Sequence, residues 1–428
     1  MRGRFLSEAR PAAEIVAVDR FGERSSTKLY CRKCRPVPSP TRTTVVVAHH
    51  TPDLYGSDLQ LLESVSALVA GGFGVVVTLP HDGPLVPLLH ERGARVDFIG
   101  VPVLRKSLLT PRGVVALAGE SVRGLWRAVR FLRRHRAAAV YVNTLTIPIW
   151  LLAARLARIP SLAHVHEAQD EGPRALRAAL VAPLLLAGST VVNSWASVQA
   201  IHNALPMAAR RVTVVYNGIA DAPEPPHPPS PVPDETPARL VQVGRLSPRK
   251  GTDVALETVA ELTRRGRNVC LDVYGTVFEG YEWFEDQLRT RASRDDIRDR
   301  VTFGGYVHPT WAALETATVV LVPSRTEPFG NTAVEAQLAQ RPVVVSAVQG
   351  LTEIVTDGQT GLLVPAEDPV ALADAVERLL DDPALAARMA SAARAEALTR
   401  FSSTGYRQRI LEAVIALVGR EGSSHSAS

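Results

Sequence analysis

Residues 238–266, ARLVQVGRLSPRKGTDVALETVAELTRRG, have the pattern of a strand, a turn and a helix. The apolar run of this stretch predicts a strand, and the later apolar residues at helical spacing predict a helix that begins near Thr252. The turn between them holds glycines, which let the backbone approach an anion, and cations beside a helix N-terminus with free N–H donors. Gly244, Arg245 and Lys250 are therefore candidates for binding a diphosphate, and a solvated basic turn is the alternative.

The alternation of strands and helices continues on both sides of this stretch. Apolar runs such as those at 43–48, 161–166 and 318–324 are continuous rather than alternating, as in parallel strands that helices cover on both faces. The predicted fold class is therefore α/β, with two doubly wound, Rossmann-like domains that face each other across a cleft. Such sheets bind ligands beyond the C-terminal ends of their strands.

Chain length and proline content divide the sequence into parts. The chain has 428 residues, of which 46% are hydrophobic, and a single core stops growing at about 250 to 300 residues. The segment DAPEPPHPPSPVPDETP cannot form a helix or the interior of a sheet, because its prolines lack N–H donors and fix φ. The predicted parts are a basic N-terminal extension (1–42), an N-terminal Rossmann-like domain (43–220), a Pro-rich linker (221–237), a C-terminal Rossmann-like domain (238–400), a helix that packs back on the N-terminal domain (401–420) and a tail (421–428).

Charge is unevenly distributed along the chain. Residues 1–220 contain 27 Lys and Arg against 14 Asp and Glu, a net charge of +13. Residues 221–428 contain 21 against 29, a net charge of −8, so the total is +5. We therefore expect the basic half to meet an anionic partner.

The apolar stretches and the number of cysteines indicate the cellular compartment of the protein. Residues 1–42 carry no apolar region of a signal peptide, and the most apolar stretch, Ala178–Val192, is shorter than the about 20 residues of a membrane-spanning helix. Cys31 and Cys34 lack the further ligands that would complete a zinc site, and so few cysteines suit a reducing compartment. These features predict a cytoplasmic protein.

Two carboxylates follow the strand predicted at 318–324. Glu327 lies in the loop EPFG, and Glu335 comes eight positions later, inside the next predicted helix. Carboxylates at the C-terminal edge of a sheet can accept hydrogen bonds from the vicinal hydroxyls of a ribose or a hexose. For Glu335, a capping box with Thr332 is an alternative that needs no ligand.

Four motifs together resemble a known family. They are the turn GRLSPRKG, the two glutamates of EPFGNTAVE, YNGI at 216–219 and DGQTGLLV at 357–364, and they occur in the family's order. The chain from about residue 43 to 415 thus resembles the retaining glycosyltransferases of family 4. The resemblance implies the GT-B fold and the transfer of a hexose-type sugar from a nucleotide-diphosphate donor.

The resemblance also implies a role for each matching residue. Arg245 and Lys250 would hold the diphosphate of the donor. His166 would lie near the reacting carbon, although a lone histidine at a strand end is more often structural. The remaining implied donor contacts are Gly244 in the same turn, Gly56 and Ser57 facing the phosphates, Glu335 at the ribose, and Glu327 at the hexose with the backbone of Phe329, Gly330 and Asn331. The sequence departs from the family at Thr276, near which a second glycine is usual.

The leaving group sets the chemical task of such a site. Negative charge grows on the β-phosphate, and Arg245, Lys250 and the helix N-terminus can stabilise that charge without a metal. The chain contains no Asp-x-Asp, the pattern typical of manganese-dependent transferases. We therefore expect no cofactor. The resemblance further implies catalytic roles for His166, Glu327, Arg245 and Lys250, and front-face attack in which the β-phosphate takes the proton of the acceptor.

A basic helix is predicted at about 114–136. One stripe of this helix carries Arg123, Arg127, Arg130 and Arg134. The stripe suits docking on anionic lipid headgroups at the inner face of the cytoplasmic membrane, and a solvated face without a partner is the alternative. Nucleic acid is not an expected partner, because the stripe lacks the repeated aromatic residues on which bases stack.

A second segment concerns the acceptor. In TLPHDGPL, residues 78–85, His81 and Asp82 follow a predicted strand and are candidates for binding acceptor hydroxyls. The alternative is that Asp82 with its following glycine only forms a turn.

The sequence thus predicts a glycosyltransferase acting on a cell-envelope, polysaccharide or lipid-linked glycan acceptor. A nucleotide-sugar epimerase or hydrolase of the same architecture and a non-catalytic nucleotide-sugar-binding subunit are the alternatives. A NAD-dependent dehydrogenase is disfavoured, because neither domain begins with the glycine fingerprint of dinucleotide-binding folds.

Overall fold

The computed structural model describes residues 43–104, 111–168, 172–228, 235–278 and 280–424. The predicted extension at 1–42, which contains Cys31 and Cys34, and the last four residues of the predicted tail lie outside the described residues. Within the predicted linker, residues 221–228 and 235–237 form neither helix nor strand.

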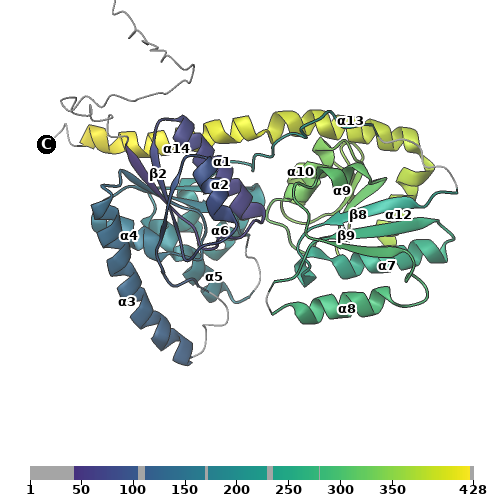
Figure 1. Cartoon of the computed structure of the whole chain (residues 1–428), viewed down its shortest axis with the longest axis horizontal. Coiled ribbons are helices and arrows are strands. Elements are labelled where there is room, and N and C mark those ends of the chain that lie inside the picture. The colour runs from purple at the N-terminus through teal and green to yellow at the C-terminus, as the bar shows by residue number, and fades with distance from the viewer. Residues whose placement is uncertain (1–42, 105–110, 169–171, 229–234, 279, 425–428) are drawn as a thin grey trace, which may run out of the picture. The chain divides into compact units, whose positions relative to one another are not determined.

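The first half of the described chain forms a seven-stranded parallel sheet in the order β3-β2-β1-β4-β5-β6-β7. This half is drawn in purple to teal in Figure 1. Its strands are β1 (Thr44–Ala48), β2 (Gly74–Leu79), β3 (Arg95–Phe98), β4 (Ala139–Val142), β5 (Ser161–Val165), β6 (Ser189–Val192) and β7 (Val212–Val214). The helices that connect them are α1 (Gly56–Ala70), α2 (Leu85–Glu91), α3 (Pro111–Arg134), α4 (Ile149–Ala157), α5 (Arg174–Val181) and α6 (Trp195–Ala204).

The second half forms a six-stranded parallel sheet in the order β10-β9-β8-β11-β12-β13. Its strands are β8 (Ala238–Val243), β9 (Val269–Tyr274), β10 (Val301–Gly305), β11 (Val319–Val322), β12 (Val343–Ser346) and β13 (Leu362–Val364). Its helices are α7 (Thr252–Arg264), α8 (Glu282–Ala292), α9 (Trp311–Glu315), α10 (Asn331–Leu338), α11 (Leu351–Ile354) and α12 (Pro369–Asp381).

The central strands are buried on both faces. In β1, Val45 and Val47 belong to one cluster of buried apolar side chains, whereas Val46 belongs to another. Because side chains of a strand alternate between the two faces of a sheet, the two clusters are the two layers that helices cover. The α/β prediction, with two parallel sheets, is confirmed.

The same strand order creates a crevice in each sheet. The chain winds outward from β1 to one side through β2 and to the other side through β4, and it does the same from β8 through β9 and β11. The loops that follow such a pair of strands diverge, which leaves room for a ligand at their C-terminal ends.

The chain ends with two long helices, α13 (Pro383–Arg400) and α14 (Ser403–Ser424), drawn in yellow-green and yellow in Figure 1. Helix α13 packs against α10, whereas α14 packs against α1 of the first half. The side chains that α14 buries in the core of the first half are Tyr406, Ile410, Val414 and Leu417.

Two contacts join the halves beside this crossing. The N–H of Ile219 donates to the carbonyl oxygen of Phe401 at 2.8 Å, so the linker starts where α13 passes into α14. The carboxylate of Glu353 in α11 accepts hydrogen bonds from the N–H groups of Trp195 and Ala196, at 2.9 and 2.7 Å. A side chain of the second half thus satisfies free donors at the start of α6 in the first half.

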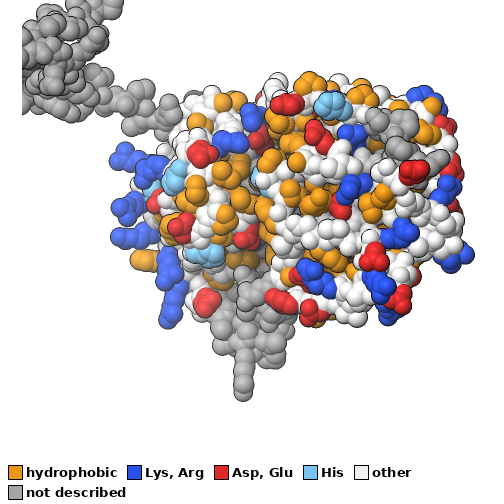
Figure 2. All heavy atoms as spheres, turned by 45° about the vertical axis from the view of Figure 1, so that its right-hand side comes forward, with side chains coloured by type: hydrophobic (Ala, Val, Ile, Leu, Met, Phe, Trp, Pro, Cys, Tyr) orange, Lys and Arg blue, Asp and Glu red, His pale blue; other side chains and the backbone are white. Residues whose placement is uncertain are grey.

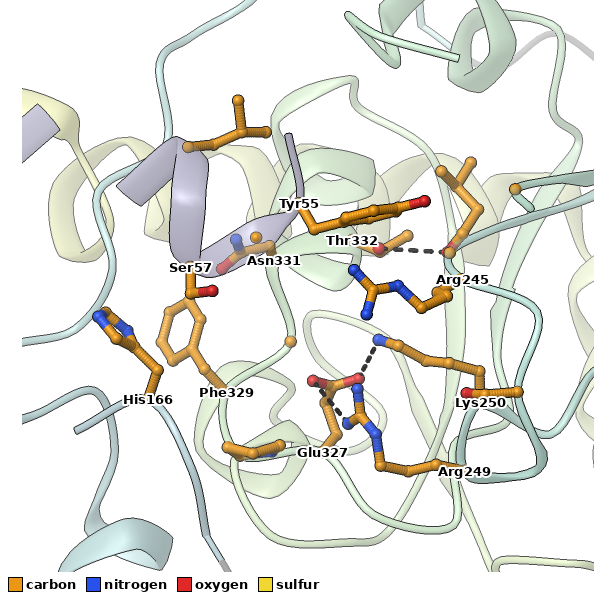
Figure 3. A pocket seen from close by; sticks show the side chains of 18 of the residues that line it. Tyr55, Ser57, His166, Arg245, Arg249, Lys250, Glu327, Phe329, Asn331 and Thr332 are labelled. Atoms are coloured by element: carbon orange, nitrogen blue, oxygen red, sulfur yellow. Dashed lines mark hydrogen bonds and ion pairs between the residues drawn. The ribbon is translucent and has the colours of Figure 1, made fainter. Parts of the chain in front are cut away.

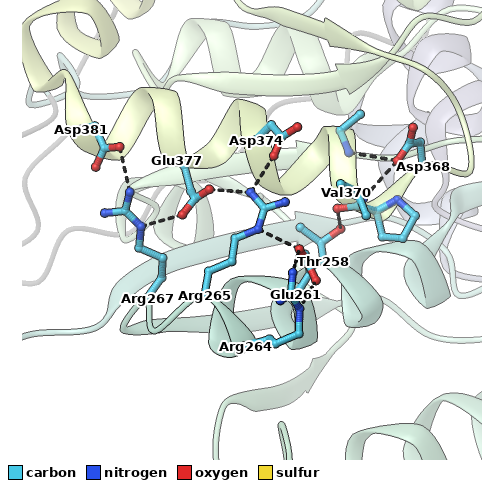
Figure 4. A network of polar contacts seen from close by, with 12 residues as sticks. Thr258, Glu261, Arg264, Arg265, Arg267, Asp368, Val370, Asp374, Glu377 and Asp381 are labelled. Atoms are coloured by element: carbon cyan, nitrogen blue, oxygen red, sulfur yellow. Dashed lines mark hydrogen bonds and ion pairs between the residues drawn. The ribbon is translucent and has the colours of Figure 1, made fainter.

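An ion-pair network joins α7 to α12 on the second half (Figure 4). Arg265 contacts Asp374 and Glu377 at 2.6 and 2.5 Å, and Arg267 contacts Glu377 and Asp381 at 2.7 and 2.8 Å. These charges fasten two neighbouring helices, and none of them lines the cleft described below. Among the described residues, no helix is long and apolar enough to cross a membrane.

Candidate functional site

A cleft of about 830 Å³ lies at the C-terminal ends of both sheets (Figure 3). Its lining comes from loops of the two halves, including those after β1, β5, β8 and β11. The lining includes every residue that the sequence analysis assigned to the donor or to catalysis, namely Gly56, Ser57, His166, Gly244, Arg245, Lys250, Glu327, Phe329, Gly330, Asn331 and Glu335. The structure therefore brings these residues together, and their individual roles stay predictions.

Glycines let the basic turn pack closely on its neighbours. Gly251 has a φ of +67°, and a Cβ at this position would lie 1.9 Å from the carbonyl oxygen of Pro323. Gly275, after β9, has a φ of +149°, and its Cβ would lie 1.8 Å from the carbonyl oxygen of Gly244. Only glycine fits either position, because any side chain would clash with backbone and strain φ. The turn GRLSPRKG is thus held against the ends of both adjacent strands.

Arg245 projects from this turn into the cleft. Its guanidinium lies over the ring of Tyr55, with Cζ 3.5 Å from the ring centre, and it also contacts the ring of Phe278. Figure 3 shows the guanidinium directly beneath the Tyr55 ring. Burial lowers the pKa of Arg245 to about 10, so the side chain is still a cation at neutral pH. The rings hold this cation by cation–π attraction and leave its N–H donors available.

Lys250 and Glu327 form a buried ion pair. The Lys250 ammonium points at the Glu327 carboxylate, and Arg249 approaches the second carboxylate oxygen at 3.6 Å (Figure 3). Burial alone would raise the pKa of Glu327, but the charges of Lys250 and Arg249 outweigh it and hold the pKa below its usual range. Glu327 is therefore an anion that accepts hydrogen bonds, placed beside two cations.

Glu335 faces the cleft without forming the capping box considered above. Helix α10 begins at Asn331, so Thr332 is already inside its first turn, and the Thr332 hydroxyl donates to the carbonyl oxygen of Val243 at 3.3 Å. The capping-box alternative is therefore wrong. The Glu335 carboxylate instead accepts from the Thr310 hydroxyl at 3.2 Å, and burial raises its pKa.

Asn331 contacts the first half of the chain. A Cβ on Gly56 would be 3.1 Å from Asn331 Nδ2, and Asn331 Oδ1 accepts from Asn217 Nδ2 at 2.9 Å. The glycine at position 56 thus lets the start of α1 come near α10 across the cleft. The Phe329 side chain is buried in the core of the second half and anchors the loop EPFG there.

His166 follows β5 on the opposite wall. Its Nε2 lies 2.9 Å from Asn143 Oδ1, and its ring centre lies 4.0 Å from that of His164. Burial, with the nearby histidines His164, His49 and His50, lowers the pKa of His166 well below its ordinary value. The imidazole that lines the cleft is therefore neutral.

Buried hydroxyl groups form hydrogen bonds that support His164. The Tyr141 hydroxyl lies 2.5 Å from His164 Nδ1 and 3.1 Å from Ser64 Oγ, which in turn lies 2.6 Å from the Tyr406 hydroxyl. Burial lowers the pKa of His164 to about 3, so this imidazole is neutral as well. Through Tyr406 these hydrogen bonds reach α14, which ties the C-terminal helix to the strand beneath the cleft.

Two predicted acceptor residues lie away from this cleft. His81 is exposed, and its Nδ1 lies 2.9 Å from the carbonyl oxygen of Asp82, whose carboxylate accepts from the N–H of Gly83 at 2.8 Å. Neither His81 nor Asp82 lines the cleft. The turn that was the alternative is thus present, and the structure does not bring the two side chains to the donor residues.

Sequence reasoning missed several residues of the cleft. Tyr55 precedes the predicted Gly56 and Ser57, its hydroxyl lies 3.2 Å from Thr276 Oγ1, and its ring contacts Arg245. Tyr306, after β10, lines the cleft and donates from its hydroxyl to a backbone carbonyl of the first half. Nothing in either local pattern signals a partner that is more than two hundred positions away in the chain.

Comparisons with known proteins agree with this architecture. The family model for glycosyl transferases group 1 matches residues 224–396, and the model for the glycosyl transferase 4-like domain matches residues 56–218. HepE from Anabaena, solved in complex with UDP and glucose, superposes with a TM-score of 0.72 at 22% identity, over 88% of this chain and 100% of that one. At that identity the superposition shows the fold.

Two curated relatives are similar over shorter segments. The alpha-D-kanosaminyltransferase of Streptomyces kanamyceticus is 37% identical over 153 residues, which are 35% of this chain and 38% of that protein. The D-inositol 3-phosphate glycosyltransferase of Frankia alni is 40% identical over 161 residues, which are 36% of this chain and 39% of that protein. The matched segments thus span about two fifths of these relatives. With two family models that together reach from residue 56 to 396, the chain belongs to the group 1 glycosyltransferases of the GT-B fold.

Proposed function

We propose that this protein is a retaining glycosyltransferase, which moves a hexose-type sugar from a nucleotide-diphosphate donor to a hydroxyl of a glycan acceptor. The observation that carries the proposal is the convergence of Arg245 and Lys250 with the Glu327 carboxylate in one cleft at the C-terminal ends of two sheets. The relatives named above are sugar transferases, and HepE was solved with UDP and glucose, which supports a sugar nucleotide as the donor.

The proposed reaction breaks the bond between the anomeric carbon and the diphosphate and forms a bond to the acceptor oxygen on the same face of the sugar. The electron pair of the broken bond stays on the β-phosphate, and a phosphate oxygen takes the proton of the acceptor hydroxyl. Arg245, Lys250 and the N–H groups at the start of α7 would stabilise the growing negative charge, because they are oriented before the reaction begins. No step in this scheme requires a metal.

The carboxylates would hold the donor by its hydroxyls. Glu327, with the backbone from Phe329 to Asn331, would contact the hexose, and Glu335 would contact the ribose. Because the Glu327 carboxylate is ionised, it can accept hydrogen bonds from two sugar hydroxyls while it stays paired with Lys250. His166 would lie near the reacting carbon on the other wall, and Gly56 and Ser57 would face the phosphates.

The first experiment is a thermal-shift screen of UDP, GDP, ADP, dTDP and their common sugar conjugates. A ligand at a hundred times its Kd stabilises the fold by about 2.7 kcal/mol, so one nucleotide family should raise Tm clearly. The shift should disappear in Lys250→Ala and persist in Arg265→Ala, which removes a cation outside the cleft. No shift with any nucleotide would contradict the donor site. Turnover of the donor without an acceptor would identify an epimerase or hydrolase, and binding without turnover would identify a non-catalytic subunit.

The proposed acceptor is a cell-envelope, polysaccharide or lipid-linked glycan met at the inner face of the cytoplasmic membrane. The outer face of α3 combines the exposed arginines Arg123, Arg127, Arg130 and Arg134 with two exposed apolar side chains, Val122 at 70% and Trp126 at 65%. Basic side chains gather along the left edge of Figure 2, on the side that α3 occupies in Figure 1. Cations beside an exposed tryptophan suit an anionic lipid surface, where the ring enters the headgroup layer.

Liposomes with anionic lipid test this surface. Binding should weaken as salt rises and in Arg127→Glu, whereas Arg298→Glu, an exposed arginine of the second half, should bind as wild type does. Binding that neither salt nor Arg127→Glu changes would leave α3 with a structural role only.

A further inference from the structure

A continuous chain of hydrogen bonds runs from His166 into the protein. His166 Nε2 lies 2.9 Å from Asn143 Oδ1, Asn143 Nδ2 lies 3.2 Å from His49 Nδ1, and His49 Nε2 lies 2.8 Å from Asp58 Oδ1. The four residues come from the ends of β5, β4 and β1 and from the first turn of α1. Parallel strands end at one edge of a sheet, so the topology gathers these residues beneath the cleft.

The carboxylate at the inner end sets the direction of every bond in the chain. A carboxylate oxygen accepts hydrogen bonds, so His49 donates from Nε2 to Asp58. An imidazole with its one proton on Nε2 accepts at Nδ1. That acceptor requires the amide N–H of Asn143, so the amide oxygen faces His166 and needs a donor there. His166 must therefore carry its proton on Nε2. Within the described part of the chain, His166 Nδ1 has no hydrogen-bond partner.

Burial makes this order strict. His49, Asp58 and Asn143 are 3%, 2% and 0% exposed, so water cannot replace a missing partner without a large rearrangement. A reversed bond would place two donors or two acceptors against each other in a site of low dielectric, at the cost of an unpaired buried polar group. The protonated form of His166 is also disfavoured there, since burial lowers its pKa.

Asp58 has a second task at the same place. It is the third residue of α1, and its Oδ2 accepts from the N–H of Tyr55 at 2.9 Å. The hydroxyl of Ser57 also points at Oδ1, at 3.3 Å. The Asp58 carboxylate thus fixes the turn that carries Gly56 and Ser57. It also fixes His49, which is the first step in the hydrogen bonds that lead to His166.

We propose that Asp58 and His49 are positioning residues, which act through Asn143 to fix His166 as the Nε2–H tautomer with Nδ1 as its acceptor atom. This inference rests on the proposed function, because it concerns the orientation of a side chain assigned to the reaction. The simpler reading of Asp58 is a helix-capping carboxylate and nothing more. That reading predicts a loss of stability on substitution but no change in the tautomer of His166.

The direct test is the ¹⁵N NMR spectrum of the imidazoles in the full chain, with the His166 signals assigned by the loss of peaks in His166→Gln. Wild type should show a protonated Nε2 and an unprotonated Nδ1 at pH 7.5. The reverse tautomer in wild type would overturn the proposal whatever the variants do. This readout needs neither donor nor turnover, so it fails or succeeds separately from the proposed function.

Two substitutions at one position then separate positioning from packing. His49→Leu removes both bonds, so Asn143 can turn and His166 should become a mixture of tautomers, with kcat about tenfold or more lower and the donor KM unchanged. His49→Gln keeps an oxygen toward Asn143 and an N–H toward Asp58, so it should restore the Nε2–H tautomer and most of the rate. His202→Leu, at an exposed histidine of α6, is the control for loss of a histidine. An unaltered tautomer of His166 in a folded His49→Leu variant would refute the proposal that hydrogen bonds through His49 fix this tautomer.

Asp58→Asn distinguishes the two tasks of the carboxylate. Because it touches both the turn and the chain, it should raise the donor KM as well as lower kcat, whereas His49→Leu should lower kcat alone. An equal rise in the donor KM in the two variants would mean that only the general packing of α1 is involved.

Discussion

The two walls of the cleft differ in the charge of their side chains. The wall built on the second sheet presents fixed charges, with the Arg245 cation between aromatic rings and the Lys250 ammonium paired with Glu327. The wall built on the first sheet is also polar, but burial keeps His164 and His166 neutral. A charged wall can stabilise an anion that develops during a reaction, whereas a neutral hydrogen-bonded wall can orient groups without adding charge. Under the proposed function, the charged wall would stabilise the leaving group and hold the donor, and the neutral wall would orient groups near the reacting carbon.

The largest effect should come from the charged wall. Arg245→Ala and Lys250→Ala should each lower kcat by about a hundredfold or more while the chain still folds, because each removes charge that acts mainly in the transition state. Steady-state release of nucleoside diphosphate, with the donor that the thermal-shift screen selects, measures the change. Wild-type turnover in both variants would show that neither residue acts in the reaction and that the charged wall does not stabilise the leaving group.

A smaller effect should come from the neutral wall, where the free energy of unfolding should fall as the pH falls. The folded pKa of His164 is about 3, below the ordinary value of 6.5, so unfolded chains bind more protons between these values and stability falls as the pH falls from 6.5 toward 3. From pH 6.5 to 5 this histidine alone should remove about 2 kcal/mol of unfolding free energy.

Urea denaturation at the two pH values checks this expectation. In His164→Asn, whose side-chain oxygen can accept from the Tyr141 hydroxyl, the loss between pH 6.5 and 5 should be smaller than in wild type. The variant serves as its own control, since its lower overall stability cancels in the difference between the two pH values. An equal loss in both proteins would mean that His164 titrates normally in the folded state.

The smallest effect should come from charges that lie outside both walls. Arg265→Ala breaks the ion pairs with Asp374 and Glu377 between α7 and α12 (Figure 4), yet solvent and neighbouring charges screen such pairs. The Tm should fall by no more than about 2 °C, less at high salt, with kcat unchanged. A large loss of activity would show that charges outside the cleft also contribute to the reaction.

Much of the charged wall is local in sequence, and the sequence could therefore predict it. Gly244, Arg245 and Lys250 lie within seven consecutive positions between one strand and one helix, so their shared location follows from secondary structure alone. Glu327 and Glu335 follow a single strand in the same way. The capping box that was the alternative for Glu335 is not formed, because α10 begins at Asn331 and places Thr332 inside the helix.

The neutral wall is assembled from residues far apart in the chain. Asp58, Asn143 and His166 come from different strand and helix ends, and only the strand order β1-β4-β5 makes them neighbours. Asn143 directly follows β4, and a polar residue at the C-terminal end of an apolar run is the one local signal that it offers. Tyr55 gave no such signal, since its partners belong to the other half of the chain.

The alternation of strands and helices, the proline boundary between the halves and the basic turn follow from local sequence, because they depend on neighbouring residues and their backbone preferences. The fold determines which side chains face each other across the cleft and leaves His81 and Asp82 outside it. It also places the Asp58 carboxylate at the end of a series of hydrogen bonds to His166. Contacts between distant segments depend on sheet order and helix packing, which no local pattern encodes.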